Sequence, residues 1–351
     1  MIEIFQEKIR EAAACRAPLR LRGGGTKDFY GNAPRGEVLD TRAYAGVVAY
    51  EPTELVVTAR GGTPLVELEQ ALARHGQFLP FEPPHFGAGA TLGGCVAAGL
   101  SGPRRASAGA LRDFLLGAKV VDGRGNLLAF GGQVMKNVAG YDVARLLAGS
   151  LGTLGLIAEA SLKVLPRPPR EATLRLVLNE EKAIEAFNRW GGQPLPVSAT
   201  AWHGGVATVR LSGAQAAVRA ALAKIGGEEL PAPQATAFWQ SVREQSDAFF
   251  AGAGPLWRLA IPSGAPPLRL PGRQFIEWGG ALRWLKSDEA AQAMREAASR
   301  ARGHATLFRA ERRAGEAFSP LGEVQMRVHR ELKAVFDPAG ILNPGRLYAA
   351  L

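Results

Sequence analysis

Consecutive glycines between two cationic side chains are the first residues in this sequence that could do chemistry. Residues 22–27 read RGGGTK and follow directly on an expected strand at 19–22. Backbone N–H groups of consecutive glycines can converge on an anion without side-chain obstruction, and the arginine and lysine would neutralise phosphate charge. Taken alone, the segment is explained equally well as a flexible turn.

Three more glycine-rich segments, at 91–94, 109–113 and 149–155, occur in the same part of the chain. Four loops that expose backbone indicate an extended ligand contacted along its length, as an adenine dinucleotide would be. Capping of helices and strands explains individual glycines, but it explains all four segments poorly. No GxxxxGK[ST] motif is present, and residues 87–93, GAGATLG, miss the third glycine of the Rossmann fingerprint and follow prolines instead of a strand.

Metal-binding patterns are absent from the sequence. The only cysteines are Cys15 and Cys95, with no CxxC, CxxxH or HxxxH spacing. These spacings exclude a cysteine-ligated iron–sulfur cluster or structural zinc within the chain. His203 and His304 are isolated from other ligand types, so we expect no metal site.

Hydrophobic periodicity predicts alternating strands and helices in the first part of the chain. A helix at 64–75 is expected to have Thr63 as N-cap and Pro64 as its first helical residue. Residues 81–103, rich in Gly, Pro and Ala, are expected to form a ligand-facing loop with one short helical stretch. The other expected elements are helices at 1–16 and 141–148, strands at 47–50, 55–58 and 156–165, and a hairpin of 114–121 with 127–130.

Three prolines at 166–169 mark the clearest boundary in the sequence, because proline interrupts both helices and strand ladders. Strand and helix patterns alternate beyond it, which predicts an antiparallel sheet with helices on one face, an α+β arrangement. The expected strands lie at 173–178, 207–211, 282–285 and 306–308, and the expected helices begin at 182 or cover 215–225, 288–301 and 321–336.

Composition and charge exclude several classes of protein. Hydrophobic residues make up 47% and charged residues 21%, as in ordinary globular proteins. The net charge of +10 is spread evenly along the chain without runs of lysine and arginine, so we expect no nucleic-acid partner. The amino terminus lacks the apolar core of a secretion signal, and the longest charge-free apolar tract, 86–100, is too short to span a bilayer. We therefore expect a cytoplasmic protein, with peripheral membrane association left open.

Residues 19–165 resemble the p-cresol methylhydroxylase-type FAD-binding domain of the vanillyl-alcohol oxidase superfamily. The resemblance implies a two-subdomain FAD-binding domain at 1–168, to which 336–351 return, and a smaller antiparallel-sheet α+β substrate domain at 169–335. The matching stretches are RGGGTK at 22–27, ELVVTARGGTPLVELEQALARHG at 54–76, GATLGGCVAAGLSG at 89–102, LRDFLLGAKVVDGRG at 111–125, KNVAGYDVARLLAGSLGTLGLIAEASLKVLP at 136–166 and FDPAGILNPGRLY at 336–348.

Within that superfamily the chain looks like the smaller flavin subunits of bacterial glycolate oxidase (glycolate dehydrogenase) complexes. VMKNVAGYD at 134–142 and GHATLFRA at 303–310 carry this likeness. It implies oxidation of glycolate, a small 2-hydroxy acid, to glyoxylate. Electrons would leave through partners, a larger FAD subunit and an iron–sulfur subunit.

The resemblance also implies roles for individual residues. The 22–27 loop would wrap the pyrophosphate, residues 91–94 would line the flavin and phosphate side, and residues 152–157 would contact the adenine and ribose. Asn343 would return to the flavin pocket. The implied FAD-binding residues are Arg22, Gly23, Gly24, Gly25, Thr26, Lys27, Thr91, Gly93, Gly94, Gly152, Thr153, Ile157 and Asn343.

Departures from the family pattern affect the chemistry. Thr26 stands where members with covalently bound flavin carry a histidine, so we expect noncovalent FAD, although His85 and Cys95 lie near the second loop. The metal and substrate motif of the larger 2-hydroxy-acid dehydrogenases is also absent. Oxidising a 2-hydroxy acid requires a base and a carboxylate-binding cation, for which His304 and Arg309 on one strand are weak candidates. A packing role explains both residues as well.

Two other functions remain open from the sequence. A free-standing FAD-dependent 2-hydroxy-acid or alcohol oxidase would reduce oxygen to hydrogen peroxide. A flavin subunit that only relays electrons would bind FAD that glycolate alone does not reduce.

Overall fold

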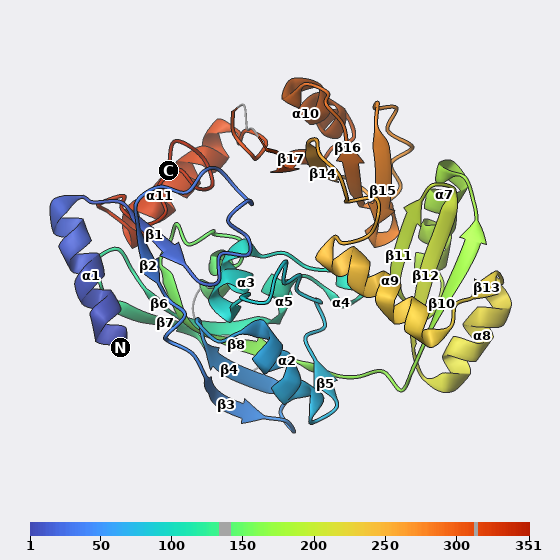
Figure 1. Ribbon diagram of the computed structural model, residues 1–351, viewed down its shortest axis with the longest axis horizontal. Coiled ribbons are helices and arrows are strands. Elements are labelled where there is room, and N and C mark those ends of the chain that lie inside the picture. The colour runs from blue at the N-terminus through green and yellow to red at the C-terminus, as the bar shows by residue number, and fades with distance from the viewer. Residues whose placement is uncertain (133–141, 312–314) are drawn as a thin grey trace.

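The computed structural model describes residues 1–132, 142–311 and 315–351. Its first large sheet is a five-stranded antiparallel sheet with the strand order β3-β4-β8-β6-β7 (Figure 1). The central strand β8 is buried along almost its entire length, because helices α2 and α3 pack on it and its neighbours. The strands are β3 (Val47–Glu51), β4 (Val56–Arg60), β6 (Leu115–Val121), β7 (Leu127–Gly131) and β8 (Leu156–Lys163), and the covering helices are α2 (Leu65–Ala73), α3 (Leu92–Ala98) and α6 (Ala144–Leu147).

The two ends of the chain pack together beside this sheet. Helix α1 (Ile2–Cys15) buries Phe5 and Ile9 against the parallel pair β1 (Leu19–Arg22) and β2 (Glu37–Asp40). After α11 (Glu323–Phe336) the chain returns to β1, where the N–H of Leu19 donates to the carbonyl of Ile341 at 2.7 Å. The carboxyl-terminal segment therefore extends the structure that begins with the first strand.

A second sheet follows the proline-rich segment and contains eight strands, all paired antiparallel, in the order β13-β10-β12-β11-β15-β16-β14-β17. An α+β fold with an antiparallel sheet in the second half is thus confirmed, whereas the domain limits at 168 and 335 stay a prediction. The strands are β10 (Arg170–Val177), β11 (Val197–His203), β12 (Val206–Gly213), β13 (Glu228–Glu229), β14 (Leu256–Ala260), β15 (Arg273–Glu277), β16 (Leu282–Lys286) and β17 (His304–Arg309).

Helices cover both faces of the second sheet, not one. Ala172 of β10 packs with α7 (Glu180–Gly191) and α8 (Gln215–Ile225), and α10 (Ala291–Arg300) covers the same face farther along. Thr173, which points to the other face, accepts a hydrogen bond from the indole of Trp239 in α9 (Ala232–Glu244). The sequence patterns did not predict α9, since only three of its side chains are buried and prolines surround its start.

Several expected boundaries differ from the observed ones. Helix α2 begins at Leu65 with Pro64 as its N-cap, because the hydroxyl of Thr63 instead accepts the N–H of Gly46 at 2.9 Å. The helix expected at 141–148 is shorter, Ala144–Leu147, and Tyr141 lies outside the described residues. The remaining short elements are β5 (Gln77–Phe78), β9 (Leu165–Pro166), α4 (Arg105–Ala108), α5 (Leu111–Phe114) and the 3₁₀ turn η1 (Trp278–Gly280).

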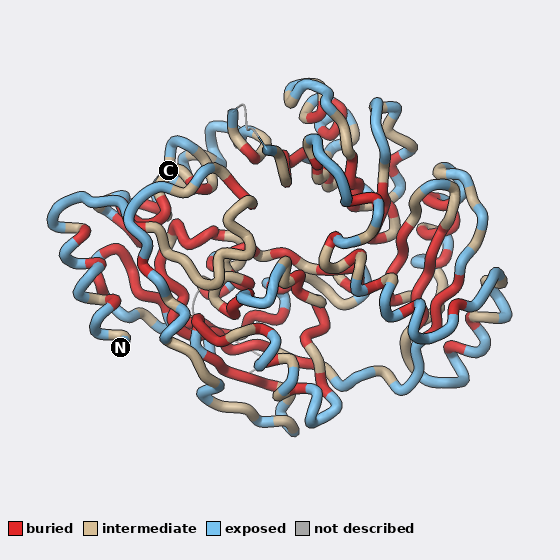
Figure 2. Tube along the Cα trace, viewed as in Figure 1, coloured by how far each residue is buried: buried red, intermediate tan, exposed pale blue. Residues whose placement is uncertain are grey.

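Burial follows this two-sheet arrangement. Figure 2 shows the buried residues concentrated along the strands of both sheets, with exposed residues on the outer turns of the helices.

Of the helices in the described part of the chain, none is both long enough and apolar enough to cross a membrane.

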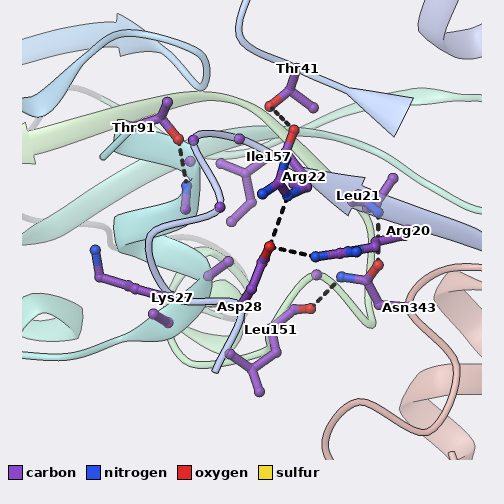
Figure 3. Close-up of a pocket in the computed structure, with 18 of the residues that line it drawn as sticks. Arg20, Leu21, Arg22, Lys27, Asp28, Thr41, Thr91, Leu151, Ile157 and Asn343 are labelled. Carbon is purple, nitrogen blue, oxygen red and sulfur yellow. Dashed lines mark hydrogen bonds and ion pairs between the residues drawn. The ribbon is translucent and has the colours of Figure 1, made fainter. Parts of the chain in front are cut away.

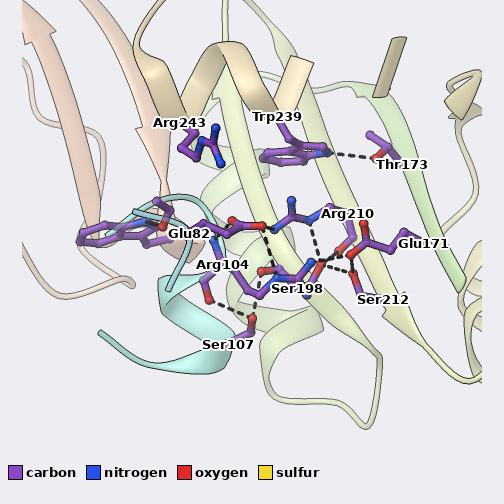
Figure 4. A network of polar contacts seen from close by, with 12 residues as sticks. Glu82, Arg104, Ser107, Glu171, Thr173, Ser198, Arg210, Ser212, Trp239 and Arg243 are labelled. Carbon is purple, nitrogen blue, oxygen red and sulfur yellow. Dashed lines mark hydrogen bonds and ion pairs between the residues drawn. The ribbon is translucent and has the colours of Figure 1, made fainter. Parts of the chain in front are cut away.

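A buried ion network joins the two sheets (Figure 4). The carboxylate of Glu82, in the long loop beside the first sheet, lies 3.3 Å from the guanidinium of Arg104 and 2.9 Å from that of Arg210 in β12. Arg104 also pairs with Glu171 of β10. Burial by itself would raise the pKa of Glu82, but the two arginines outweigh it and hold that pKa below its usual value.

Replacing Glu82 with glutamine should destabilise the protein, because buried Arg210 loses its charged partner and buried Arg104 keeps only the exposed carboxylate of Glu171. We expect a loss of about 3–5 kcal/mol in the free energy of unfolding at neutral pH, measured by urea denaturation. The matched change Glu229→Gln, in the exposed Arg170–Glu229 pair, should cost about 0–1 kcal/mol.

The two variants should also differ in their response to acid. Since the folded-state pKa of Glu82 is lowered, its contribution is complete above the unfolded-state pKa and is lost as the pH falls through the folded-state value. Equal losses of stability in the two variants would contradict a linking role for Glu82.

Candidate functional site

A groove open to solvent lies where β1, the start of α3 and the carboxyl-terminal segment meet (Figure 3). Most of its lining comes from four regions that are distant in sequence, residues 20–28, 91–98, 151–157 and 343–346, and Pro34 and Thr41 complete it. The structure thus brings together most of the residues that the sequence pointed to. These groove-lining residues are Arg22, Gly23, Gly24, Gly25, Thr26, Lys27, Thr91, Gly93, Gly94, Gly152, Ile157 and Asn343.

The loop at 23–27 lines the groove. None of these five N–H groups donates to an acceptor among the described residues. Consecutive unpaired N–H groups of this kind form a concave anion-binding site. The loop therefore fits the anionic part of a ligand through its backbone.

Close contacts explain why this loop is made of glycines. A Cβ atom on Gly24 would lie 1.5 Å from the carbonyl oxygen of Gly89, and one on Gly23 would lie 2.2 Å from the hydroxyl of Thr91. Gly25 has φ +71°, in the region that favours glycine. The glycines are required by the contact between two loops as well as by access to a ligand.

Positive charge surrounds the loop. Arg20, Arg22, Lys27 and Arg346 line the groove against a single carboxylate, Asp28. Figure 3 shows Arg20 and Arg22 converging on Asp28, with the Nε of Arg22 2.9 Å from it, while Lys27 extends to the other side of the loop. Burial lowers the pKa of Lys27. The excess of cations favours an anionic ligand.

The start of α3 contributes in a different way from the first loop. The N–H groups of Leu92 and Gly93 donate to the carbonyls of Thr63 and Gly61, and Thr91 accepts the N–H of Gly94 at 3.3 Å. These groups are therefore already paired. Thr91, Gly93 and Gly94 form a closely packed wall and leave the anion to the loop at 23–27.

The far end of the groove is closed by the carboxyl-terminal segment. The side chain of Asn343 accepts the N–H of Leu21 at 2.7 Å and donates to the carbonyl of Leu151 at 2.6 Å. Thr153 does not line the groove, because its hydroxyl is buried and donates to the carbonyl of Ser150 at 2.8 Å. Its own carbonyl accepts a hydrogen bond from Lys333.

The two nucleophilic side chains near the second loop are not part of the groove lining. The Nε2 of His85 lies 3.2 Å from the carboxylate of Glu69, and Cys95 is 2% exposed. Burial raises the pKa of the Cys95 thiol to about 12. Neither residue is part of the groove lining, which favours a ligand held without a covalent bond.

The structure does not bring the weak catalytic candidates His304 and Arg309 together. They occupy the two ends of β17, roughly 16–17 Å apart at about 3.3 Å per residue. Arg309 packs against the rings of Phe29 and Phe86, at 4.3 and 4.9 Å from their centroids, and burial lowers its pKa to about 10. A two-carbon hydroxy acid cannot reach both side chains.

Some groove residues were not predicted from the sequence. Arg20, Asp28 and Arg346 lie outside the glycine-rich segments. The guanidinium group of Arg346 donates to the carbonyls of Asn32 and Asp28, and these hydrogen bonds hold the loop after residue 27 in place. The only sequence feature that pointed to one of these three residues is the LNPG turn, which Arg346 follows directly. In the described part of the chain no three His, Cys, Asp or Glu side chains are placed to hold a metal ion.

Comparison with known proteins supports this interpretation of the groove. The sequence matches a family model described as an FAD binding domain at residues 2–131, and one described as the C-terminal domain of FAD linked oxidases at residues 312–347. Alkyldihydroxyacetonephosphate synthase has the same fold, with a TM-score of 0.66 and 16% sequence identity over 97% of this chain and 74% of the synthase.

Curated relatives extend the comparison over the whole chain. Glycolate oxidase subunit GlcE of Escherichia coli (strain K12) is 48% identical over 345 residues, which are 98% of this chain and 97% of the relative. Glycolate oxidase subunit GlcD of Bacillus subtilis (strain 168) is 34% identical over 45% of this chain and 34% of its own length. A D-lactate dehydrogenase of Archaeoglobus fulgidus is 36% identical over 43% of this chain and 34% of that enzyme.

The fold and the groove are those of an FAD-dependent oxidoreductase of the p-cresol methylhydroxylase and vanillyl-alcohol oxidase type. The chain belongs to the glycolate oxidase subunit GlcE family. The resemblance on which the sequence prediction rested is confirmed, and so are the FAD cofactor and the fold class.

The residues present fit FAD by their chemistry. Five unpaired backbone N–H groups and a surplus of arginine and lysine suit a pyrophosphate, which carries two negative charges. The glycines leave the loop surface free of side chains. The lining of the loop therefore suits the anionic part of FAD.

Replacing Gly24 with alanine should weaken FAD binding, because the new methyl group forces apart the loops at 24 and 89. We expect at least a roughly 10-fold rise in the dissociation constant for FAD, measured by flavin fluorescence quenching. Gly264→Ala is the matched control, because no atom lies within 4 Å of the place that a Cβ atom would take and because its φ lies outside the left-handed region that favours glycine. Unchanged FAD affinity in the Gly24 variant would contradict the described loop contact.

Proposed function

We propose that this protein is the FAD-binding subunit of a glycolate-oxidising complex, converting glycolate to glyoxylate and passing electrons to an iron–sulfur partner subunit. The near full-length identity to a glycolate oxidase subunit is the observation that carries the proposal. The relatives named above are oxidoreductases acting on CH–OH groups, and this chain shares their family. The protein thus oxidises a small 2-hydroxy acid.

The groove residues divide the work of binding FAD. The loop at 22–27 holds the pyrophosphate through its N–H groups, and Thr91 with Gly93 and Gly94 forms the wall beside the flavin. Gly152 and Ile157 line the side proposed for the adenine and ribose. Asn343 supports the groove through hydrogen bonds that hold β1 to residue 151. Thr153 supports it through the hydrogen bond that its carbonyl accepts from Lys333.

Binding is proposed to be noncovalent. The side chain of Thr26 offers no site for the known flavin linkages to histidine or cysteine, and His85 and Cys95 are engaged or buried outside the groove. Bound FAD supplies the acceptor for the substrate's hydride. The protein's own groups must then bind the carboxylate, orient the hydroxyl group and exclude water.

The two-sheet architecture suggests a division of labour along the chain. We assign FAD binding to residues 1–168 together with 336–351, and the substrate side to residues 169–335. This division is supported by the position of the groove, which is lined only by residues from the first set. The second sheet then faces the flavin end of the ligand.

Partner subunits complete the electron path in this proposal. A reduced flavin must give its electrons to another centre, and the sequence contains only two cysteines, too few for an iron–sulfur cluster. The names of two relatives describe them as subunits. A larger flavin subunit and an iron–sulfur subunit are therefore the proposed partners.

Anaerobic absorbance of the purified, FAD-loaded chain tests the proposal. Addition of glycolate should bleach the flavin bands, because hydride transfer reduces the ring, whereas ethylene glycol, which lacks the carboxylate, should leave them unchanged. If the isolated chain is not bleached, the same titration of the assembled complex distinguishes an electron-relay role from a requirement for partners. Absence of bleaching in both preparations would contradict the proposal.

A further inference from the structure

Two arginines from different parts of the fold meet at one tryptophan. The guanidinium carbon of Arg105, in α4, lies 4.5 Å from the ring centroid of Trp278, and that of Arg258, in β14, lies 5.3 Å from it. Helix α4 follows the groove wall in sequence, whereas β14 belongs to the second sheet. The two cations therefore converge across the junction between the sheets.

Neither arginine has a counter-ion of its own. Among the described residues, neither guanidinium group makes an ion pair or a side-chain hydrogen bond, and the closest acidic influence on Arg105 is the charge of Asp113. Both are only partly buried, so their guanidinium groups are within reach of a ligand from solvent. Burial, and next the charge of Arg258, lower the pKa of Arg105, as expected for cations held close together.

The strand register places further polar groups on the same face as Arg258. Arg258 pairs with Thr306, and Ala260 pairs with His304, so His304 lies one step along the same face of the neighbouring strand. Burial, and next the charge of Arg258, lower the pKa of His304. His304 is thus the neighbour of Arg258 and not of Arg309.

Trp278 is held in an unusual conformation. Its φ is +55°, which is rare for a bulky aromatic residue, and its indole N–H donates to the carbonyl of Gly102 at 3.0 Å. Backbone strain of this kind persists only where surrounding contacts impose it, and it concentrates at functional sites. The hydrogen bond to Gly102 helps to hold the indole beside the two arginines.

The buried carboxyl group of Glu277, which lies near Arg258, does not neutralise that arginine. Glu277 is 4% exposed and accepts the indole N–H of Trp284 at 2.7 Å. Burial raises the pKa of Glu277 to about 8, so the carboxyl is largely protonated at neutral pH. The positive charge at this position remains available to an anion.

A cluster of buried apolar residues connects this position to the wall of the FAD groove. Ala98 and Leu151 line the groove, and they belong to the same apolar cluster as Trp278 and Leu282 at the base of the second sheet. Tyr30, three residues beyond the loop at 23–27, is also part of that cluster. Burial raises the pKa of Tyr30, and the nearby charge of Arg258 acts to lower that pKa. Arg258 therefore lies on the face of the sheet that packs toward the groove.

We propose that Arg258 and Arg105 bind the carboxylate of the 2-hydroxy acid substrate, with Trp278 as the surface that positions both guanidinium groups. The inference rests on the proposed function, since it names the substrate-binding residues of the same oxidation. Guanidinium groups suit a carboxylate because their forked N–H donors match its two oxygens. A site formed by both sheets also requires them to be correctly placed before substrate binds.

Oxalate binding to the FAD-loaded chain tests the site without turnover, since oxalate offers carboxylates but no C–H bond to oxidise. Isothermal calorimetry should show that Arg258→Met weakens oxalate binding roughly 10- to 100-fold. Arg105→Met should weaken it less, and Arg258→Lys should give an intermediate loss because charge is kept and the fork is lost. Arg112→Met, which removes an exposed charge near Arg105, is the matched control and should leave binding unchanged.

The outcomes separate this inference from the proposed function. Flavin absorbance of each variant reports FAD binding, so a wild-type chain that fails to bind FAD would overturn the proposed function. Retained FAD with equal oxalate affinity in wild type, Arg258→Met and Arg258→Lys would overturn the carboxylate site, and so would wild-type protein that binds FAD but no oxalate. A lower melting temperature with unchanged oxalate affinity would show that the arginines serve only packing between the sheets.

Discussion

The buried carboxylate of Glu82 is the interaction on which the relation between the two sheets depends. It pairs with Arg104 at the end of the long loop and with Arg210 in β12. One carboxylate therefore joins the loop to a strand that lies 128 residues farther along the chain. The same contact sets the start of α4, whose first residue is Arg105. The position of Arg105 beside Trp278 follows from an ion network that lies outside the groove lining.

The carboxyl-terminal return provides a second constraint. The ammonium group of Lys333 is buried and donates to the carbonyls of Thr153 and Leu342 and to the carboxylate of Asp337, at 2.7–2.8 Å. It thereby ties the last helix to the segment that forms one wall of the groove. Asn343 and Arg346 then reach β1 and the loop that follows it. The groove exists only when both ends of the chain are in place.

The groove separates two tasks that glycine-rich loops often combine. At 23–27 the glycines leave backbone donors unpaired for an anion, whereas at the start of α3 the donors are paired within the protein and the small residues permit close packing. Positive charge dominates both positions. Arginine and lysine side chains lie along the groove and at the junction between the sheets, and the nearby carboxyl group of Glu277 is largely protonated and so adds little negative charge. Anionic ligands thus meet positive potential at both positions.

The sequence by itself determined the cofactor class and most of the groove. The family resemblance carried by several motifs in order gave these predictions, and the RGGGTK segment, the strand at 19–22 and the LNPG turn each specify local backbone geometry. Helical periodicity likewise predicted α1, α8 and α10 closely. Helix α9 was missed because most of its surface is exposed and its burial depends on the opposite face of a sheet formed by distant strands.

Only the tertiary structure decided which charged side chains act together. His304 and Arg309 are close in sequence but occupy opposite ends of a strand, whereas Arg105 and Arg258, 153 residues apart, meet at one indole ring. Pairings of this kind depend on strand register and on the buried Glu82 network, both of which are long-range. The sequence specifies which groups are available, and the packing of the two sheets decides which of them share a site.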